Sequence, residues 1–526
     1  MNATYVRAPL LLMLGIAVSA CSSLRSDFVK TPSQALPPAF DTPSARYVQS
    51  ELEEHRGLSG FRLLTGSTNA LMSRIALIDH AEHSIDLQYY IFENDATGRL
   101  VAQRLLAAAD RGVRVRMLLD DLGLDHEDHM LDALDAHPNI KVRLFNPFNT
   151  RDPSLPSKIA QFILEGQRLN RRMHNKSLIA DNAAAIVGGR NIGDGYFDAR
   201  NDTNFRDLDV IAVGPVVTQA SSAFDDYWNS DAAFPVTAFR NTRNTDADLV
   251  KVRAALAHDA RKFADSDYAQ ASLEKLPYGA TADRRGEWFW GSGNLLADLP
   301  EKIKAESDTP ELRIGPQLKS VTDVASTEVL LISPYFVPGE KGTNYLIGLA
   351  QRGVAVKVLT NSLASTDEPA AHAGYEHYRN RLLAGGVQLF ELRPAAGEKQ
   401  SATAAGASSG VSLHAKAFVV DRRYVFVGSM NMDPRSKLLN TEMGVMVDCP
   451  GLAGAVAQFF ATASSPANAF HVELLPATDA ASGHARLTWV SESNGATVTY
   501  DHDPDATRSR RLEVSLLRLL PIEGLL

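Results

Sequence analysis

A pattern that occurs twice, at one fixed separation, limits the possible folds of this chain more than any other feature. Each copy reads HxKxxxxD and is followed by a glycine and, three residues later, by an asparagine. The two histidines stand 414 − 174 = 240 positions apart, and every matched residue keeps this separation. Such a register predicts a duplicated domain. The matched residues are His174, Lys176, Asp181, Gly188 and Asn191 in the first copy, and His414, Lys416, Asp421, Gly428 and Asn431 in the second.

The residue types in this pattern suit chemistry on a phosphate group. Side chains alternate along a strand, so His174 and Lys176 are expected on the same face. A neutral imidazole can attack phosphorus, and a protonated one can donate a proton to a leaving oxygen. A lysine beside it supplies positive charge for phosphate oxygens. Two such faces brought together would surround one phosphate, and this chemistry requires no metal or other cofactor.

The duplication extends beyond the two motifs. Residues 84–92 and 113–119 predict two strands with a helix between them, and the same succession returns over residues 329–359. Arg111 and Arg352 open similar stretches that lie 352 − 111 = 241 positions apart. A β-α-β unit favours a parallel or mixed sheet covered by helices. We therefore expect an α/β fold with two similar lobes, each a mixed β-sheet flanked by helices, related by a pseudo-twofold axis.

The paired motifs resemble those of the phospholipase D superfamily. Within it, the sequences RMHNKS, GGRNIGD, LHAK and DPRSKLLNTE resemble the bacterial cardiolipin synthase branch of type C. The likeness covers most of the chain after about Gly60. It implies a first phospholipase D-like lobe over residues 60–220, a connector over 221–310, a second lobe over 311–450 and a C-terminal extension over 451–526.

The resemblance also implies a two-step reaction on phospholipid phosphodiesters, of the cardiolipin synthase kind. One histidine attacks phosphorus and forms a covalent phosphohistidine, while the other protonates the leaving alcohol and later deprotonates the acceptor. The usual assignment in the family makes His174 the nucleophile and His414 the acid and base, although sequence symmetry leaves the order open. Two alternatives use the same histidines: a phospholipase D hydrolase that releases phosphatidic acid, and an exported endonuclease.

Supporting roles follow from the same resemblance. Lys176 and Lys416 are expected to hold phosphate oxygens, and Asn191 and Asn431 to donate hydrogen bonds to them. Asp181 and Asp421 complete the motifs as catalytic candidates, but both follow a strand at a turn, where aspartate commonly binds backbone amides and supports structure.

Two further expectations concern the carboxylates beside the histidines and one difference between the two copies of the motif. Asp209 and Glu442 are expected to orient the imidazoles, because each lies in the segment that follows a motif. Gly189 occupies the position that Ser429 has in the second copy. We expect Arg190 to replace the missing hydroxyl at the phosphate.

The composition of the chain limits which binding partners are expected. The 526 residues carry a net charge of −9, which argues against a nucleic-acid partner and so against the endonuclease. Phospholipid is the expected substrate, and a monomer is compatible with the sequence. The two cysteines, Cys21 and Cys449, make a disulfide framework improbable.

The N-terminus predicts a membrane anchor. An apolar run over residues 8–20 ends in VSAC, which resembles the lipobox of bacterial lipoproteins. We expect a signal peptide over residues 1–21, a lipid on Cys21 and a flexible tether over 22–59. A plain signal peptide cut after Ala20 is the alternative. The expected location is the bacterial cell envelope, as a membrane-anchored lipoprotein at the outer membrane or the periplasmic face.

Two other segments leave alternatives open. Trp288, Phe289 and Trp290 suit either packing in the connector or contact with acyl chains. Residues 508–526 predict an amphipathic helix, either docked on the body or lying on a membrane.

Overall fold

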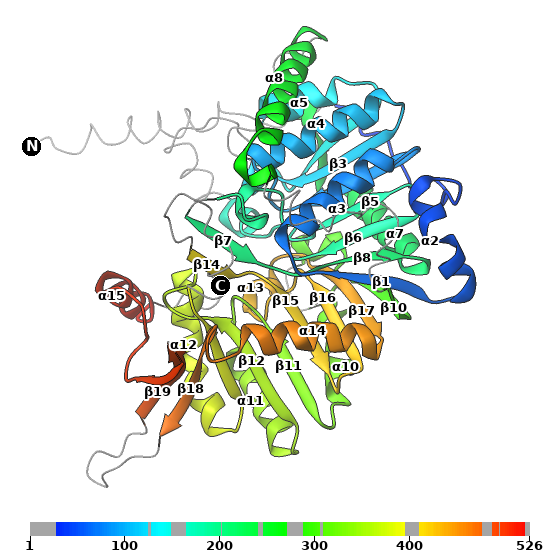
Figure 1. Cartoon of the computed structure of the whole chain (residues 1–526). Helices are drawn as coiled ribbons and strands as arrows, with labels where there is room; N and C mark the ends of the chain where they lie inside the picture. The colour runs from blue at the N-terminus through cyan, green and yellow to red at the C-terminus, as the bar shows by residue number, and fades with distance from the viewer. Residues whose placement is uncertain are drawn as a thin grey trace, which may run out of the picture.

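The computed structural model describes residues 28–124, 128–148, 165–200, 202–239, 246–270, 288–305, 309–394, 410–475, 486–493 and 495–520. Two α/β lobes lie one above the other in Figure 1, with the N-terminal half in blue and green and the C-terminal half in yellow to red. This agrees with the two-lobed mixed α/β fold expected from the duplicated sequence.

The first lobe contains a mixed sheet in the spatial order β9-β4-β3-β2-β5-β6-β8-β1. Strands β2, β3 and β4 are parallel, and the other pairings are antiparallel. All six residues of β2 are buried, because helices cover both faces of the sheet. Its strands are β1 Ser59–Leu64, β2 Ser84–Tyr89, β3 Arg114–Asp120, β4 Ile140–Phe145, β5 Ser177–Ala180, β6 Ala184–Gly188, β8 Asp209–Val213 and β9 Ala233–Pro235.

The helices of the first lobe begin and end where the sequence gives clear signals. Asp95 caps α4 by accepting a hydrogen bond from the amide of Gly98, as expected for an aspartate at this position. Gly112 follows the helix with a φ of +97°, a conformation that suits glycine. The helices are α2 Pro43–Glu54, α3 Ser67–His80, α4 Ala96–Asp110, α5 Asp128–Asp135, α7 Pro215–Asn229 and α8 Asp246–Ala264, with short 3-10 turns at Asp121–Gly123, Asp194–Tyr196 and Val236–Phe239.

The second lobe repeats this plan, with strands in the order β20-β19-β18-β13-β12-β11-β15-β16-β17-β10. Strands β11, β12 and β13 are parallel, as β2, β3 and β4 are. The strands are β10 Phe289–Ala297, β11 Glu328–Ile332, β12 Ala355–Asn361, β13 Gln388–Leu392, β15 Lys416–Val420, β16 Tyr424–Gly428, β17 Met443–Asp448, β18 Ala469–Leu475, β19 Arg486–Ser493 and β20 Ala496–Tyr500. The helices are α10 Gly315–Asp323, α11 Gly339–Gln351, α12 Pro369–Ala384, α13 Pro434–Leu438, α14 Pro450–Ala463 and α15 Arg508–Leu517, with 3-10 turns at Pro300–Lys304 and Pro310–Leu312.

Strand β10 joins the two sheets. Its first residues pair with β1 of the first lobe, and residues Ser292 to Ala297 pair with β17 of the second lobe. A parallel pair, β7 Thr203–Arg206 and β14 Gly410–Leu413, forms a second connection between the lobes. Side chains from both lobes also share one buried apolar core, which contains Met173 and Val445 among others. The lobes therefore form one body with a fixed junction.

The two lobes of the structure extend beyond the limits expected at residues 220, 310 and 450. Helix α7 runs past residue 220 and packs on strands of the first lobe, and β10 belongs to the sheet of the second. Helix α14 and strands β18 to β20 also complete the second lobe. Of the aromatic cluster, Trp290 stacks on His55 with ring centroids 4.6 Å apart, which agrees with packing in the connector.

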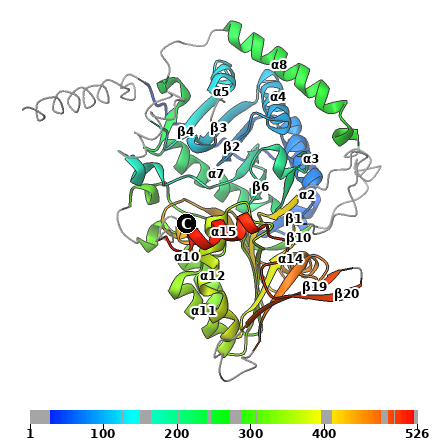
Figure 2. The ribbon, with the colours of Figure 1, turned by 90° about the vertical axis from the view of Figure 1, so that its left-hand side faces the viewer.

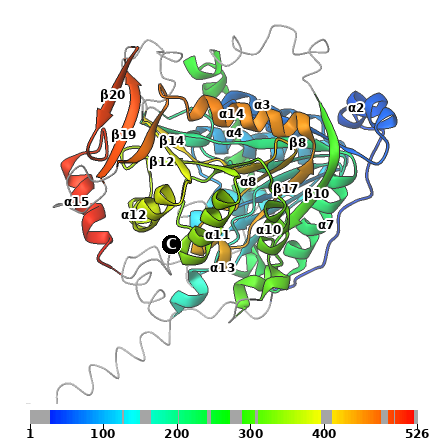
Figure 3. The same cartoon turned by 90° about the horizontal axis from the view of Figure 1, so that it is seen from below.

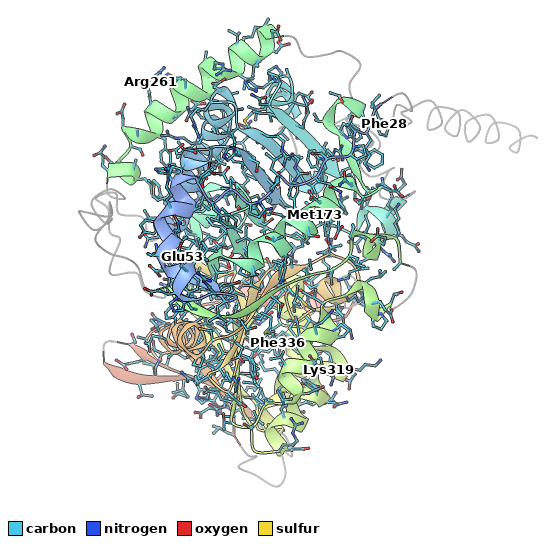
Figure 4. The ribbon with its side chains drawn as sticks, turned by 90° about the vertical axis from the view of Figure 1, so that its right-hand side faces the viewer. Phe28, Glu53, Met173, Arg261, Lys319 and Phe336 are labelled. Atoms are coloured by element: carbon cyan, nitrogen blue, oxygen red, sulfur yellow. The ribbon has the colours of Figure 1, made fainter. Side chains whose placement is uncertain are left out.

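Residues 28–41, called here the N-terminal segment, do not behave as the free tether that was expected. They run in extended form along the first lobe, and Phe28, labelled in Figure 4, packs on Phe234 with ring centroids 5.7 Å apart. Polar side chains of the lobe bind the backbone of this segment. The bonds include Arg116 Nη1 to Ser33 O at 2.9 Å, Asn182 Nδ2 to Leu36 O at 2.9 Å and Ala35 N to Asp225 Oδ2 at 2.7 Å.

Candidate active site

The two motif histidines line one pocket of about 380 Å³ at the junction of the lobes. His174 lies just before β5, and His414 lies between β14 and β15. The pocket therefore forms where the two copies of the motif meet. Its lining consists of Tyr90, Ile91, His174, Asn191, Tyr196, Tyr335, Asp367, Glu368, Ala371, His414, Asn431, Asp433, Arg435, Ser436 and Asn440.

Each histidine is held by a carboxylate from the opposite lobe. His174 Nδ1 lies 2.9 Å from Glu442 Oε2, and His414 Nδ1 lies 2.5 Å from Asp207 Oδ2. The backbone brings these pairs together, because the amide of His174 donates to the carbonyl of Thr441 at 2.9 Å. In the same way, the amide of His414 donates to the carbonyl of Arg206 at 2.7 Å. With Nδ1 engaged in both rings, Nε2 is the ring atom left for chemistry.

The expectation for Asp209 was wrong. Its carboxylate contacts the guanidinium groups of Arg74 at 2.9 Å and Arg190 at 3.1 Å, and all three side chains are buried. Strand register explains the error: Gly188 pairs with Asp209 in the first lobe, whereas the equivalent Gly428 pairs with Gly444 in the second. The counterpart of Glu442 is therefore two residues before Asp209, at Asp207.

The expectation for Arg190 was also wrong. Its side chain is fully buried and does not line the pocket. Besides Asp209, it donates to the backbone carbonyls of Leu64, Thr65 and Asp207. Arg190 therefore holds the segment that leads to Asp207, and does not replace a hydroxyl at the phosphate.

The asymmetry between Gly189 and Ser429 follows from the two carboxylates. Ser429 Oγ donates to Glu442 Oε2 at 2.5 Å, so its hydroxyl positions the glutamate and does not face the pocket. A Cβ on Gly189 would lie 2.1 Å from Asp207 Oδ1, so no side chain fits there. The shorter aspartate sits directly against the backbone, whereas the longer glutamate is held by a hydroxyl.

Both motif lysines are buried beside the histidines. Lys176 Nζ donates to the carbonyl of His174 at 2.7 Å and lies 5.2 Å from the centroid of the Tyr90 ring. Lys416 Nζ donates to the carbonyl of His414 in the same manner. Each ammonium group is thereby fixed close to its imidazole.

The two motif asparagines line the pocket, as expected for groups that contact substrate. Asn191 Oδ1 accepts from the amide of Ile91, and its Nδ2 donates to the hydroxyl of Tyr196 at 2.8 Å. Asn431 Oδ1 is buried without a hydrogen-bond partner in the described residues. The two positions are therefore not equivalent, since Asn191 is already engaged with Tyr196.

The two motif aspartates lie outside the pocket lining. Asp181 accepts hydrogen bonds from the amides of Glu82, His83 and Ser84, at the start of β2. Asp421 binds the amides of Ser326, Thr327 and Glu328 in the same way, at the start of β11. This placement agrees with structural support and not with direct action on a substrate.

Burial and neighbouring charges set the protonation of the site. Burial, followed by Lys176 and Lys416, lowers the pKa of His174, and burial with Lys416 lowers the pKa of His414, which Asp207 partly restores. Burial disfavours the charge on Asp207, but its contacts with His414, Lys416 and Arg190 lower the pKa of Asp207 to about 2. Burial raises the pKa of Glu442 to about 7 and lowers the pKa of Lys416 to about 8. The two halves of the site are therefore electrostatically different.

Several pocket residues were not found from the sequence. Asp367 and Glu368 come from the loop before α12, and Arg435 from α13. Tyr90, which follows β2, and Tyr335, which lies after β11, also line the pocket.

Fold and site together define a phospholipase D-type enzyme, a phosphodiesterase or phosphatidyltransferase with one histidine-lysine pair from each lobe. A family model described as "Cardiolipin synthase, PLD-like domain" matches residues 75–228 and 318–463. These two stretches cover more than half of the sequence, so the chain belongs to this family.

Individual relatives agree with this assignment. The chain is 38% identical to "Cardiolipin synthase C" of Escherichia coli (strain K12), over 90% of this chain and 97% of the relative. It is 27% identical to "Cardiolipin synthase B" of the same strain, over 70% of this chain and 72% of the relative. The crystal structure of phosphatidylserine synthase from Haemophilus influenzae Rd KW20 shares the fold, with a TM-score of 0.54 and 12% identity, over 91% of this chain and 100% of that chain.

Proposed function

We propose that this chain transfers a phosphatidyl group from one phospholipid to another, with cardiolipin as product and a phosphohistidine as intermediate. The observation that carries the proposal is the pair of imidazoles in one pocket, each held through Nδ1 by a carboxylate from the opposite lobe. Similarity to cardiolipin synthase C of E. coli supports transfer to a lipid head group over the hydrolase alternative.

In the proposed first step, His174 Nε2 attacks phosphorus and the bond from phosphorus to the leaving alcohol breaks. His414 donates its proton to the leaving oxygen. In the second step, His414 takes the proton of the acceptor hydroxyl, the acceptor oxygen attacks phosphorus, and the bond to His174 breaks. The lowered pKa of His174 supports its role as the nucleophile, because only the neutral ring can attack.

The surrounding groups are assigned to binding. Lys176 and Lys416 stabilise the charge that develops on the phosphate oxygens, and Asn191 and Asn431 donate hydrogen bonds to them. On the second-lobe side, Tyr335 donates to Asp367 Oδ2 at 2.7 Å. The carboxylates of Asp367 and Glu368 offer hydrogen-bond acceptors for the hydroxyl groups of a glycerol head group.

The proposal is tested with the purified full chain and vesicles of phosphatidylglycerol. We expect cardiolipin and glycerol in equal amounts, measured by mass spectrometry and an enzymatic glycerol assay. Phosphatidic acid without cardiolipin would show a hydrolase and overturn the transfer step. Cleavage of plasmid DNA in chelator would identify the endonuclease instead.

Asp207 is proposed to hold His414 in its cationic form. Replacing Asp207 with asparagine removes the charge that raises the pKa of His414, so His414 loses its proton at lower pH. We expect kcat to fall by roughly 10²–10⁴-fold. The alkaline limb of kcat/KM should move down by about one pH unit or more.

The measurement is a pH–rate profile of the purified variant beside the wild type. His258→Ala, on the exposed face of α8, serves as the control and should keep both the rate and the profile. A variant with lower kcat but an unmoved alkaline limb would show that Asp207 is only structural.

We also propose that Cys21 carries a lipid and holds the chain at the cell envelope. Cys21 lies outside the described residues, so the support is the lipobox-like sequence and the N-terminal segment. That segment is bound to the first lobe from Phe28 on, which is 28 − 21 = 7 residues after Cys21. Seven extended residues reach at most about 25 Å, so an anchor there keeps the body at the membrane surface.

Replacing Cys21 with serine should abolish incorporation of labelled fatty acid and move the chain out of the membrane fraction. Labelling of cells followed by fractionation measures both. Cys449→Ser is the matched control, because Cys449 is a buried thiol in the second lobe. Unchanged labelling in the Cys21 variant would reject the anchor.

A further inference from the structure

Helix α15 and the turn that follows it expose four leucines. Leu512, Leu516, Leu519 and Leu520 are 62%, 57%, 77% and 55% exposed. Positions 512, 516 and 519 follow helical spacing, so these side chains share one face of the helix and of the turn that follows it. Val514, on the opposite face, is 1% exposed and packs in a small core with Leu363 and Ala373. We call the four exposed residues the leucine face.

The net charge of α15 and its flanking residues is opposite in sign to that of the whole chain. Residues 507–520 contain four arginines and one glutamate, a net charge of +3, whereas the whole chain carries −9. An apolar face with arginines around it is the pattern of helices that lie in the interface of anionic membranes. A bilayer with anionic head groups complements both the apolar face and the arginines.

The helix is fixed to the wall of the active-site pocket. Arg510 Nη2 donates to the carbonyl of Thr366 at 2.5 Å, directly before the pocket residues Asp367 and Glu368. Asp503, which precedes the helix, accepts from Arg379 Nη1 of α12 at 3.0 Å. Figure 3 shows α15 beside α12, and Figure 2 shows it on the side of the molecule where the lobes meet. Helix α15, and with it the leucine face, is therefore held in a fixed orientation beside the pocket wall.

We propose that the leucine face of α15 docks on a phospholipid bilayer with anionic head groups and brings the pocket to the lipid surface. None of the described helices has the length and apolar character of a transmembrane segment. The benefit for catalysis rests on the proposed function, because it assumes that the substrate lies in the bilayer. The contact itself does not depend on that assumption.

Contact is tested by placing a tryptophan at Leu516 in the full chain and adding vesicles whose acyl chains carry bromine. Bromine quenches only tryptophans within the bilayer, whatever holds the protein to the vesicle. Val250→Trp on α8, where the native side chain is 63% exposed, is the matched control. We expect quenching of the added emission at 516 and none at 250. Equal quenching at both positions, or none at 516, overturns the proposal.

A second experiment links docking to turnover. Leu512→Ser with Leu516→Ser should weaken partition onto vesicles of phosphatidylglycerol by roughly tenfold or more. Turnover on those vesicles should fall in parallel, while turnover on short-chain phosphatidylglycerol dissolved as monomers stays unchanged. Val250→Ser should change neither.

The remaining outcomes separate the possible causes. A wild-type chain that binds vesicles through Leu516 but turns over neither substrate contradicts the proposed function and leaves docking in place. Loss of a dimer in the double variant, measured by analytical ultracentrifugation, with unchanged partition would assign the leucine face to a second copy and reject the lipid surface.

Discussion

Replacing His174 with alanine is expected to lower phosphatidyl transfer by at least about 10⁴-fold, because it removes the imidazole on which the proposed covalent intermediate forms. His414→Ala should cost a similar factor, since the leaving alcohol then departs without a proton. The double variant should be little worse than either single one, because the two residues act as a unit. Initial rates on phosphatidylglycerol vesicles measure all three.

Both variants should fold normally. The two imidazoles line a pocket and contribute little to the apolar cores, so both variants should stay folded, although the loss of the contacts with Glu442 and Asp207 lowers the temperature of unfolding. The variant His258→Ala, which removes an exposed histidine far from the proposed chemistry, again serves as the control. Either single variant that retains more than a few per cent of its turnover would be incompatible with the two-histidine reaction.

Asp209→Ala is expected to be the most destabilising single change near the site, by about 3–5 kcal/mol in the free energy of unfolding of the first lobe. Its carboxylate is the buried partner of two guanidinium groups, those of Arg74 and Arg190. Its removal leaves two cations uncompensated in the interior. Chemical denaturation followed by circular dichroism measures the effect.

An exposed ion pair gives the matched control. Asp448 pairs with Arg423 at 2.8 Å, but the two side chains are 33% and 58% exposed. Asp448→Ala should therefore cost less than about 1 kcal/mol. An equally small effect of Asp209→Ala would mean that its pairing with Arg74 and Arg190 is not the structural support described above.

The sequence predicted those parts of the molecule that depend on a repeated pattern. Two motifs in one register predicted the duplicated lobes and the meeting of His174 with His414 at one pocket. The strand expected at His174 and Lys176 begins only at Ser177. Glu442 was expected near an imidazole and lies 2.9 Å from His174 Nδ1.

The errors arose where the two copies lose their common register. The separation is 240 positions at the histidines but 442 − 207 = 235 between the carboxylates that hold them, because the first copy has more residues after its motif. The periodicity of the sequence does not show where these extra residues lie. Asp209 was therefore expected at the imidazole, and Asp207 was missed. The N-terminal segment was misjudged for another reason. Its composition is that of a flexible linker, whereas its order comes from lobe side chains such as Arg116 and Asn182, which bind its backbone.

The most direct test of the central claim is to trap the intermediate on this pair of imidazoles. The full chain is mixed with phosphatidylglycerol, quenched rapidly in alkali, which preserves phosphohistidine, and digested for peptide mass spectrometry. We expect a phosphatidyl adduct, or the glycerophosphoryl adduct left when alkali hydrolyses its acyl esters, on the peptide that contains His174, and no adduct at that position in His174→Ala. Active enzyme with no adduct at His174, under conditions that preserve a phosphohistidine standard, would contradict the account.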